Sequence, residues 1–565
     1  MAGTILTPNL IWKNFFVAPD FKPVVIKEEV VDDIVYTHLY FSGKNVSDGT
    51  VKIYGVMAKG IQHGVGPAIL LPRDFYYQDD AELVSFFVNK GYTVLSIDLM
   101  GKRDGPNYYT SYPQSLSFAN YEKAKEELYT IRGGVQESCW YEWACAVRYA
   151  LGFLKSKPEI TKVGAIGIGE SATAVWEAAG MDANLDCALF VLNTGWIGYR
   201  GINKFGGMVE PQFSDNMYKF IAGVEPQAYA MHVKCPTLVL SSTNSKNFDA
   251  DRAYDTISRI DDQIFSGVNY SVGYREKVSE GAFNTASVFL NNFLMKEDDK
   301  KGTLPFEIDV KCEILDGKMI VTVSADDKNL ETVALYASEQ TVDPSKRSWH
   351  KSTAYREKTA EGFVFEYLPY KGSEIVTFFA QCTYKSGYEI GSKIIAKRFK
   401  ENEIDFPHKS KILYSSRIQD AESVFAPADD NENALDVFAS KRESVKVNKG
   451  PMGISGVCSE SGLLSFKINA NKDKPSDNSI LMFDVYSKEK GHVTVRLIAD
   501  YYGQKTEYVA WVSLLGGEMW QNVRIALHKF KTEEGMTLKS YEKIQAIAIK
   551  HEQDGKYLIN NVLWV

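Results

Sequence analysis

The sequence predicts a multidomain protein, with a doubly wound α/β domain first and two all-β domains after it. The 565 residues amount to roughly three to four typical domains of about 150 residues each. Up to about residue 297, short apolar strands alternate with amphipathic helices, which is typical of a mostly parallel sheet covered on both faces. After residue 304 the helical period disappears, and alternating apolar and polar residues indicate strands alone.

The predicted α/β domain spans residues 1–297 and ends in a charged linker, KEDDKK. A helix is expected over 139–156, where apolar residues recur at helical spacing, and another over 281–294 closes the domain. Six apolar runs have the length and composition of buried strands, and they lie at 51–58, 67–72, 92–98, 162–168, 187–193 and 236–242.

The rest of the chain divides into two β-rich parts joined by a polar segment. Residues 304–400 predict a small immunoglobulin-like β-sandwich, with alternating stretches such as KMIVTVSA and EIVTFFAQCTY. A segment rich in Lys, Asp and Asn, residues 401–433, reads as a linker. Residues 434–565 contain further strands, and we expect a jelly-roll β-sandwich there.

Composition excludes several classes of function. The net charge of -8 is spread along the chain, which argues against a nucleic-acid surface and favours a neutral small-molecule partner. No run of about 18 apolar residues and no signal-peptide pattern occurs, so neither a membrane span nor export is expected, although a secreted chain with its leader removed would look the same. The seven cysteines show no CxxC pair or metal-ligand spacing, which indicates reduced thiols in a cytoplasmic protein. We expect no metal and no cofactor, and the oligomeric state is not predicted.

One segment carries a recognisable turn. KVGAIGIGESATAVWEAAG, residues 162–180, runs from a strand through a Gly-rich turn into a helix, and it resembles the nucleophile elbow of the α/β-hydrolase superfamily. The resemblance covers about the first 297 residues and implies a carbohydrate or short-acyl ester as substrate class.

The elbow motif aligns in two registers. In the first, Gly167 to Ser171 takes the place of G-x-S-x-G, as in dienelactone hydrolases and acetyl xylan esterases, and the nucleophile position falls on Gly169, which has no side chain. In the second, residues 169–173 resemble the GESAG of carboxylesterases, with Ser171 as nucleophile and the N–H of Ala172 in the oxyanion hole. The distance from the elbow to the next strand favours the first register, and both stay open.

The other two members of a catalytic triad are missing from their expected places. The general base should follow the last strand, but residues 269–283 contain no histidine, and Arg275 stands near that position with a guanidinium that cannot act as a base. The acid should follow the strand at 236–242, where relatives resemble G-T-N-D and this chain has Ser245 in place of the aspartate. Asp249 or Asp251 could reach the site, or could cap the following helix.

A pocket is expected at the carboxyl ends of the strands even without a triad, because ligands of open α/β sheets bind there. Asp74, Asp98, Glu170, Ser171 and Arg275 could converge in one cleft, or could form an internal ion-pair cluster. The resemblance places the oxyanion loop at Arg73, Asp74, Phe75 and Tyr76. The aromatic stretch 106–121 reads either as a lid or as packed core.

The C-terminal part has its own resemblance. DGKYLINNVLWV at the C-terminus and MWQNVRIALHKF at 519–530 are similar to galactose-binding-type jelly rolls, which include carbohydrate-binding modules. Trp511 and Trp520 are interpreted either as core residues or as platforms for sugar.

Three hypotheses follow. The first is a degenerate hydrolase that binds a ligand or has an unassigned role, and the second is an active serine esterase that uses Ser171 with a base such as His350 or His408 from a neighbouring domain. The third is a structural or assembly protein.

Overall fold

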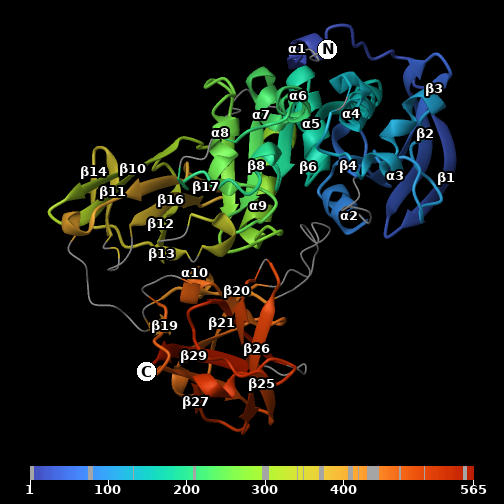
Figure 1. Ribbon diagram of the computed structural model, residues 1–565. Coiled ribbons are helices and arrows are strands. Elements are labelled where there is room, and N and C mark those ends of the chain that lie inside the picture. The colour runs from blue at the N-terminus through green and yellow to red at the C-terminus, as the bar shows by residue number, and fades with distance from the viewer. Residues whose placement is uncertain are drawn as a thin grey trace.

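The computed structural model shows three regions arranged along the chain (Figure 1). The residues it describes are 5–73, 81–131, 133–182, 184–207, 211–295, 304–339, 342–347, 349–367, 369, 374–404, 412–417, 419–428, 444–469, 473–501, 503–551 and 557–565.

The first region is built on a sheet that mixes antiparallel and parallel strands. Its first nine strands lie in the order β1-β2-β3-β5-β4-β6-β7-β8-β9, parallel from β5 to β9 and antiparallel before that. Each of the six predicted strand segments coincides with or overlaps one of these strands. The strand bounds are β1 Val24–Val31, β2 Ile34–Val46, β3 Gly49–Gly60, β4 Gly66–Arg73, β5 Thr93–Asp98, β6 Ile160–Ile168, β7 Cys187–Val191, β8 Thr237–Ser242 and β9 Ser266–Ser271.

Helices cover both faces of this sheet, as its strands require. The central strands are apolar on both sides, so alternate residues of one strand enter different cores: Leu70 packs with α4 and α5, and Ile69 packs with α2 and α9. Helix α4 is buried nearly all round, and Ser138 caps it by accepting a hydrogen bond from the N–H of Tyr141. The helices are α1 Pro8–Ile11, α2 Ala81–Asn89, α3 Tyr121–Ala124, α4 Cys139–Lys155, α5 Ser171–Met181, α6 Asp215–Gly223, α7 Pro226–Tyr229, α8 Ala253–Ile257 and α9 Glu280–Leu290.

The second region continues the same sheet. Strand β17 lies antiparallel beside β9, with Gly391 opposite Val268, and β16, β12 and β13 follow it. A separate four-stranded sheet, β10-β11-β15-β14, shares a core with these strands and with α2 and α9. The new bounds are β10 Ile308–Leu315, β11 Lys318–Ala325, β12 Leu330–Glu339, β13 His350–Ser352, β14 Glu357–Thr359, β15 Gly362–Tyr367, β16 Ile375–Tyr384, β17 Glu389–Gly391 and β18 Ile395–Arg398.

This continuity differs from the separate domain expected over residues 304–400. Strand β9 is the last parallel strand of this sheet, and β17 joins it through the single residue pair Gly391 and Val268. The N–H of Tyr270 on β9 donates instead to the side chain of Gln381 on β16, at 2.9 Å. The sequence shows the strands but not which edge they extend.

The third region is a two-layered β-sandwich, drawn in orange and red in Figure 1. One sheet has the order β21-β22-β29-β24-β27, with β19 also beside β29, and the other has the order β20-β23-β28-β25-β26. Strands β19 and β20 come from the segment expected to be a linker. The bounds are β19 Ile412–Tyr414, α10 Ala421–Val424, β20 Ala426–Pro427, β21 Lys446–Lys449, β22 Ser455–Cys458, β23 Leu463–Ser465, β24 Ile480–Ser487, β25 Gly491–Ala499, β26 Thr506–Leu514, β27 Gln521–Ala526, β28 Ile544–His551 and β29 Tyr557–Trp564.

Two global features bear on the setting of the protein. All seven cysteines lie in the described part of the chain, and there none of them forms a disulfide. No described helix combines the length and the apolar composition needed to cross a bilayer.

Candidate functional site

The strand order reverses at β4, because β5 lies on one side of it and β6 on the other. Loops that follow the strands on either side of such a reversal border the crevice in which open α/β sheets bind ligands. Residues 74–80 after β4 lie outside the described residues, so the predicted Asp74, Phe75 and Tyr76 are not placed. The loop after β6 is described in full.

That loop is a sharp turn with its apex at Gly169. Strand β6 ends at Ile168, Gly169 has φ of 56°, and helix α5 begins at Ser171. A positive φ of this size favours glycine because other side chains are strained there. A Cβ on Gly167 would lie 2.5 Å from the Cα of Ala172, so a residue without a side chain lets the helix approach the strand.

Ser171 lies in the first turn of α5 with its side chain directed back to the strand. It is only 2% exposed, and its Oγ donates to the carbonyl of Ile168 at 2.8 Å and accepts from the N–H of the same residue at 3.1 Å. The N–H of Ala172 points to the carbonyl of Gly169 at 3.3 Å. Both groups that the second register would use therefore have contacts within the turn.

Glu170 is the charged residue at the turn, and it is as buried as Ser171. Its Oε1 accepts a hydrogen bond from the hydroxyl of Tyr129, and the guanidinium of Arg200 lies 3.5 Å from the same oxygen. Burial raises the pKa of Glu170, and Arg200 opposes that shift. Neither partner was identified from the sequence, because both come from distant loops.

Asn193, which follows β7, ties the turn to the neighbouring strand. Its amide Nδ2 donates to the carbonyl of Gly169 at 2.8 Å and to the hydroxyl of Thr173 at 3.1 Å. Thr173 stands where GESAG has its last glycine, and here it takes part in holding the turn. The elbow is thus fastened by internal hydrogen bonds.

The loop after β9, residues 272–279, connects to the C-terminal sandwich. Arg275, at the expected place of the base, donates a hydrogen bond to the hydroxyl of Tyr501 and lies 5.2 Å from the centre of its ring. The next residue, Glu276, is buried and accepts hydrogen bonds from Ser245 Oγ at 3.0 Å and from the N–H of Lys246 at 2.9 Å. A carboxylate and a hydroxyl therefore meet between the two loops in which the sequence analysis sought the base and the acid.

The loop after β8 connects to the second region. Asn244 donates to the carbonyl of Arg347 at 2.6 Å and accepts from the indole N–H of Trp349 at 3.2 Å. Asp251 makes a two-bonded ion pair with Arg347, with Nη2 to Oδ2 at 2.7 Å, and both side chains are fully buried. Glu276 and this pair were missed, because no local pattern marks contacts between distant segments.

Asp249 serves as a cap. Its carboxylate accepts from the N–H of Asp251 at 3.0 Å and pairs with Arg252. Burial and the charge of Asp251 raise the pKa of Asp249 to about 6. Capping and ion pairing account for its position.

Asp98, at the end of β5, accepts hydrogen bonds from the loop that follows this strand. Its carboxylate accepts from the N–H groups of Gly101 and Thr110, at 3.1 and 2.8 Å, and from Arg103 at 2.6 Å. Arg73, at the end of β4, has its guanidinium 5.7 Å from the centre of the Tyr54 ring. Asp98, Glu170, Ser171 and Arg275 thus each contact a different segment.

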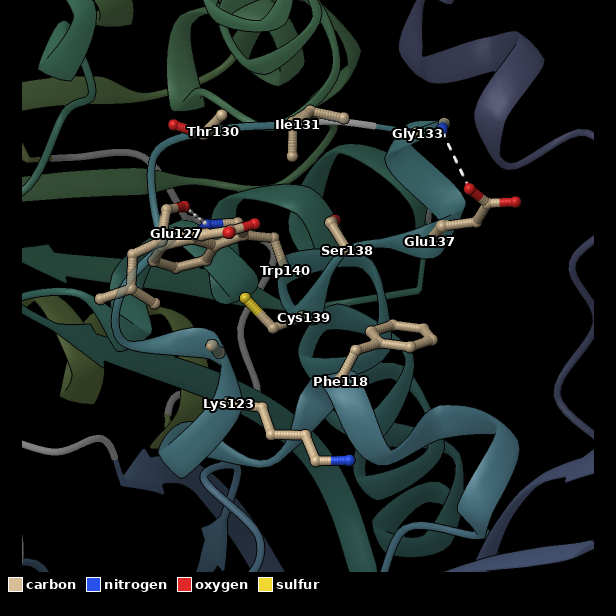
Figure 2. A pocket seen from close by; sticks show the side chains of 13 residues that line it. Phe118, Lys123, Glu127, Thr130, Ile131, Gly133, Glu137, Ser138, Cys139 and Trp140 are labelled. Atoms are coloured by element: carbon tan, nitrogen blue, oxygen red, sulfur yellow. Dashed lines mark hydrogen bonds between the residues drawn. The ribbon is translucent and has the colours of Figure 1, made fainter.

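A cavity of about 150 Å³ lies at the N-terminus of α4, beside the segment 127–131 (Figure 2). Phe118, Leu128, Ile131 and Trp140 supply apolar surface, and Lys123, Glu127 and Glu137 also line it. Phe118 belongs to the aromatic stretch 106–121, in which Tyr112, Phe118 and Tyr121 pack against the core and Tyr108 is exposed. None of the predicted site residues lines this cavity.

The described histidines and metal-binding residue types offer little further chemistry. His350, a candidate base, lies on β13 with its ring 6.3 Å from the ring of Tyr367, and His408 lies outside the described residues. Within the described ranges, no group of three or more His, Cys, Asp or Glu side chains could hold a metal ion.

The chain resembles solved structures in its fold, but it matches neither a protein-family model nor a curated protein sequence. Acetyl xylan esterase 1 from Thermoanaerobacterium sp. JW/SL YS485 is 14% identical over 51% of this chain and 95% of its own, with a TM-score of 0.39. The acetyl xylan esterase from Paenibacillus sp. R4 is 14% identical over 51% of this chain and 92% of its own, with a TM-score of 0.39. The glucuronoyl esterase from Solibacter usitatus is 12% identical over 50% of this chain and 90% of its own, with a TM-score of 0.35. Likeness this loose carries no argument about chemistry.

Proposed function

We propose that this protein has an α/β-hydrolase-type N-terminal domain that has lost serine-hydrolase chemistry and serves in ligand binding. The observation that carries the proposal is the conformation of Gly169. In an elbow the nucleophile occupies the left-handed residue of the turn, and here that residue is Gly169, which has no side chain. The strand order and the reversal at β4 support the fold assignment.

The surroundings of the turn support the same proposal. Ser171 can serve as a nucleophile only if a base takes its proton. Its Oγ is buried, and its hydroxyl donates a hydrogen bond to the carbonyl of Ile168. The loops that would supply acid and base instead carry the Ser245–Glu276 pair and the contacts to Arg347 and Tyr501. The carboxylate of Glu276, which accepts a hydrogen bond from Ser245, cannot replace the histidine imidazole that transfers the proton in a catalytic triad.

The C-terminal sandwich is proposed to be a jelly roll. Its strands alternate between sheets in the orders β22-β29-β24-β27 and β23-β28-β25-β26, which support two interleaved Greek keys. Free thiols support a reducing compartment, so a cytoplasmic location belongs to the proposal.

The proposal is tested by hydrolysis of short-chain p-nitrophenyl esters and acetylated xylan, together with labelling by a fluorophosphonate probe. We expect neither turnover nor labelling above background in the wild type or in Ser171→Ala. Ser287→Ala is a matched control, because its hydroxyl also bonds to a backbone carbonyl, at 3.2 Å, but in α9. Turnover and labelling that disappear in Ser171→Ala and persist in Ser287→Ala would contradict the proposal.

A scaffold role is a second candidate, favoured by one observation. The acid-position and base-position loops both bind segments of the later regions, and α10 contacts both β13 and β19. In Figure 1, α10 lies between the second region and the sandwich. These contacts would hold the three regions in a defined arrangement.

A further inference from the structure

The cavity at the N-terminus of α4 and the turn after β6 lie on two sides of one segment, residues 127–131. Leu128 and Ile131 line the cavity. Tyr129, between them in the sequence, donates a hydrogen bond from its hydroxyl to Glu170 at the turn. A molecule in the cavity therefore contacts the segment that binds Glu170.

The cavity is apolar inside and polar at its rim (Figure 2). The buried side chains of Leu128, Ile131 and Trp140 supply apolar walls. Lys123 and Glu127, which also line the cavity, are exposed. An apolar cavity of about 150 Å³, the volume found here, can hold one benzene molecule. The walls therefore have room for the apolar part of a small ligand, and the rim can contact its polar part.

Hydrogen-bond donors gather at the inner end of the cavity, where α4 begins. Ser138 caps the helix by accepting from the N–H of Tyr141. Within the described residues, the N–H groups of Cys139 and Trp140 have no acceptor, and both residues are buried. A buried N–H without an acceptor is destabilising, so an acceptor on a ligand is favoured at this place.

The thiol of Cys139 is a third donor at the same place. Its residue is 6% exposed, and Figure 2 shows Sγ among the side chains that line the cavity. Burial raises the pKa of this thiol, and the N–H groups of Trp140 and Cys139 oppose the shift because they lie beside Sγ. The thiol is therefore protonated at neutral pH and adds a weak donor to the two N–H groups.

Charges of both signs surround the cavity. Glu127 and Glu137 contribute carboxylates, and Lys123 contributes an ammonium group that donates to Ser117 Oγ at 2.8 Å. At the inner end, the N-terminus of α4, a helix of 17 residues, carries a partial positive charge. An anion is thus favoured at the inner end, and a cation is favoured near the two carboxylates.

We propose that this cavity binds a free α-amino acid with an apolar side chain. The carboxylate of the ligand accepts hydrogen bonds from the N–H groups that open α4. Its ammonium group lies near the two carboxylates, and its side chain packs against the apolar walls. The inference rests on the proposed ligand-binding role and names the ligand, but it does not require the loss of esterase chemistry.

Ligands with only one of the two charges use the cavity less completely. An apolar acid without an amine brings a second negative charge to Glu127 and Glu137 with no cation between them. An apolar amine without a carboxylate leaves the N–H groups of Cys139 and Trp140 without an acceptor. Binding of these analogues is therefore the natural comparison.

The test is calorimetric titration of the full chain with leucine and with phenylalanine at millimolar concentrations. We expect at least one of them to bind. Isocaproate and hydrocinnamate lack the ammonium group, whereas isoamylamine and phenethylamine lack the carboxylate. We expect the amines to bind about tenfold or more weakly than the matching amino acid, because hydrogen bonds to a charged group are lost.

Glu127→Gln locates the ammonium group, and Glu126→Gln is its matched control. Both residues are exposed and adjacent in sequence, but only Glu127 lines the cavity. Glu127→Gln should weaken binding of the amino acid by about three- to fivefold and should not weaken binding of the matching acid. Glu126→Gln should bind both as the wild type does.

Ala124→Leu tests the cavity itself, because Ala124 is buried and lines it. The larger side chain should abolish binding. Should this variant fail to fold, Glu127→Gln decides the location alone, since it changes an exposed side chain.

Three results overturn the inference: binding of neither amino acid, binding of an acid or amine analogue as tight as that of the matching amino acid, and equal effects of Glu126→Gln and Glu127→Gln. Ester hydrolysis and probe labelling are measured on the same samples. Turnover that depends on Ser171 contradicts the proposed loss of hydrolase chemistry, whereas absence of amino-acid binding overturns only the present inference.

Discussion

The turn at Gly169 and the surface around Trp511 on β26 differ in how far their polar and aromatic side chains are exposed to solvent. At the turn, Glu170 and Ser171 are each 2% exposed and have partners within the protein. On the sheet, Trp511 is 61% exposed, and the ring of His492 lies 6.4 Å from its indole centre. Polar residues that suggest chemistry in a sequence can be fully engaged by hydrogen bonds within the fold, and an aromatic residue that could belong to a core can lie exposed on the surface.

The later regions explain part of this difference. Arg347 and Tyr501 reach the loops after β8 and β9 and engage Asp251 and Arg275. Polar groups at that edge of the N-terminal sheet are therefore used in joining regions.

The largest effect is expected where the regions are joined. Arg347→Ala leaves the carboxylate of Asp251 buried without its charge partner and should lower the free energy of unfolding by about 3–5 kcal/mol. Arg496→Ala breaks a pair on the C-terminal sheet whose side chains are 27% and 25% exposed, and because water reaches both partners the loss should be no more than about 1 kcal/mol. Chemical denaturation measures both, and equal losses would contradict the contrast.

A pH-dependent effect is expected behind the turn, at Glu177 of α5. This side chain is fully buried with the hydroxyl of Tyr229 at 3.2 Å, and burial raises its pKa well above the usual value. A raised carboxyl pKa means that the folded state holds the proton longer. The contribution of Glu177 to stability is therefore greatest at low pH and falls from about pH 4.5 upward, by at most about 1.4 kcal/mol per pH unit, until the folded pKa is passed.

Glu177→Gln tests this sign directly. The variant lacks the titrating group, so its stability relative to wild type should increase as the pH rises from 5 to 8 in denaturation series. The exposed Glu280→Gln in α9 is the control and should follow the wild-type profile. A constant difference between Glu177→Gln and wild type would show that Glu177 is ionised throughout.

The conformation of the turn sets the next effect. Gly169→Ala places a Cβ on a residue with φ of 56° and should destabilise the protein by about 1–2 kcal/mol. Gly207→Ala, at an exposed glycine with open space around it, should change stability little. Thermal unfolding of both variants measures the strain that the added Cβ introduces, and a neutral Gly169→Ala would show that the turn accommodates a side chain at this position.

The smallest effect is expected at Trp511. Because most of its ring is exposed, Trp511→Ala should lower the free energy of unfolding by no more than about 1 kcal/mol. Denaturant unfolding of this variant beside Arg347→Ala gives the comparison in one experiment. A loss of several kcal/mol would show that Trp511 belongs to the packing of the sandwich.

The sequence by itself determined the local features of this protein. Apolar runs predicted the six strands, and the glycines at 167 and 169 predicted the turn. The amino-acid sequence also shows directly that residues 269–283 contain no histidine. Hydrophobic periodicity and backbone preference act over a few residues, so they can be read without knowing the fold.

Tertiary structure alone decided what each polar group contacts. Glu170 meets Tyr129 and Arg200 across 41 and 30 positions of sequence, and Asp251 meets Arg347 across 96. The extension of the sheet from β9 to β17 and the opposite environments of Trp511 and Trp520 likewise follow from long-range pairing. Such contacts depend on which surfaces remain uncovered once all strands have paired, and no window of the sequence contains that information.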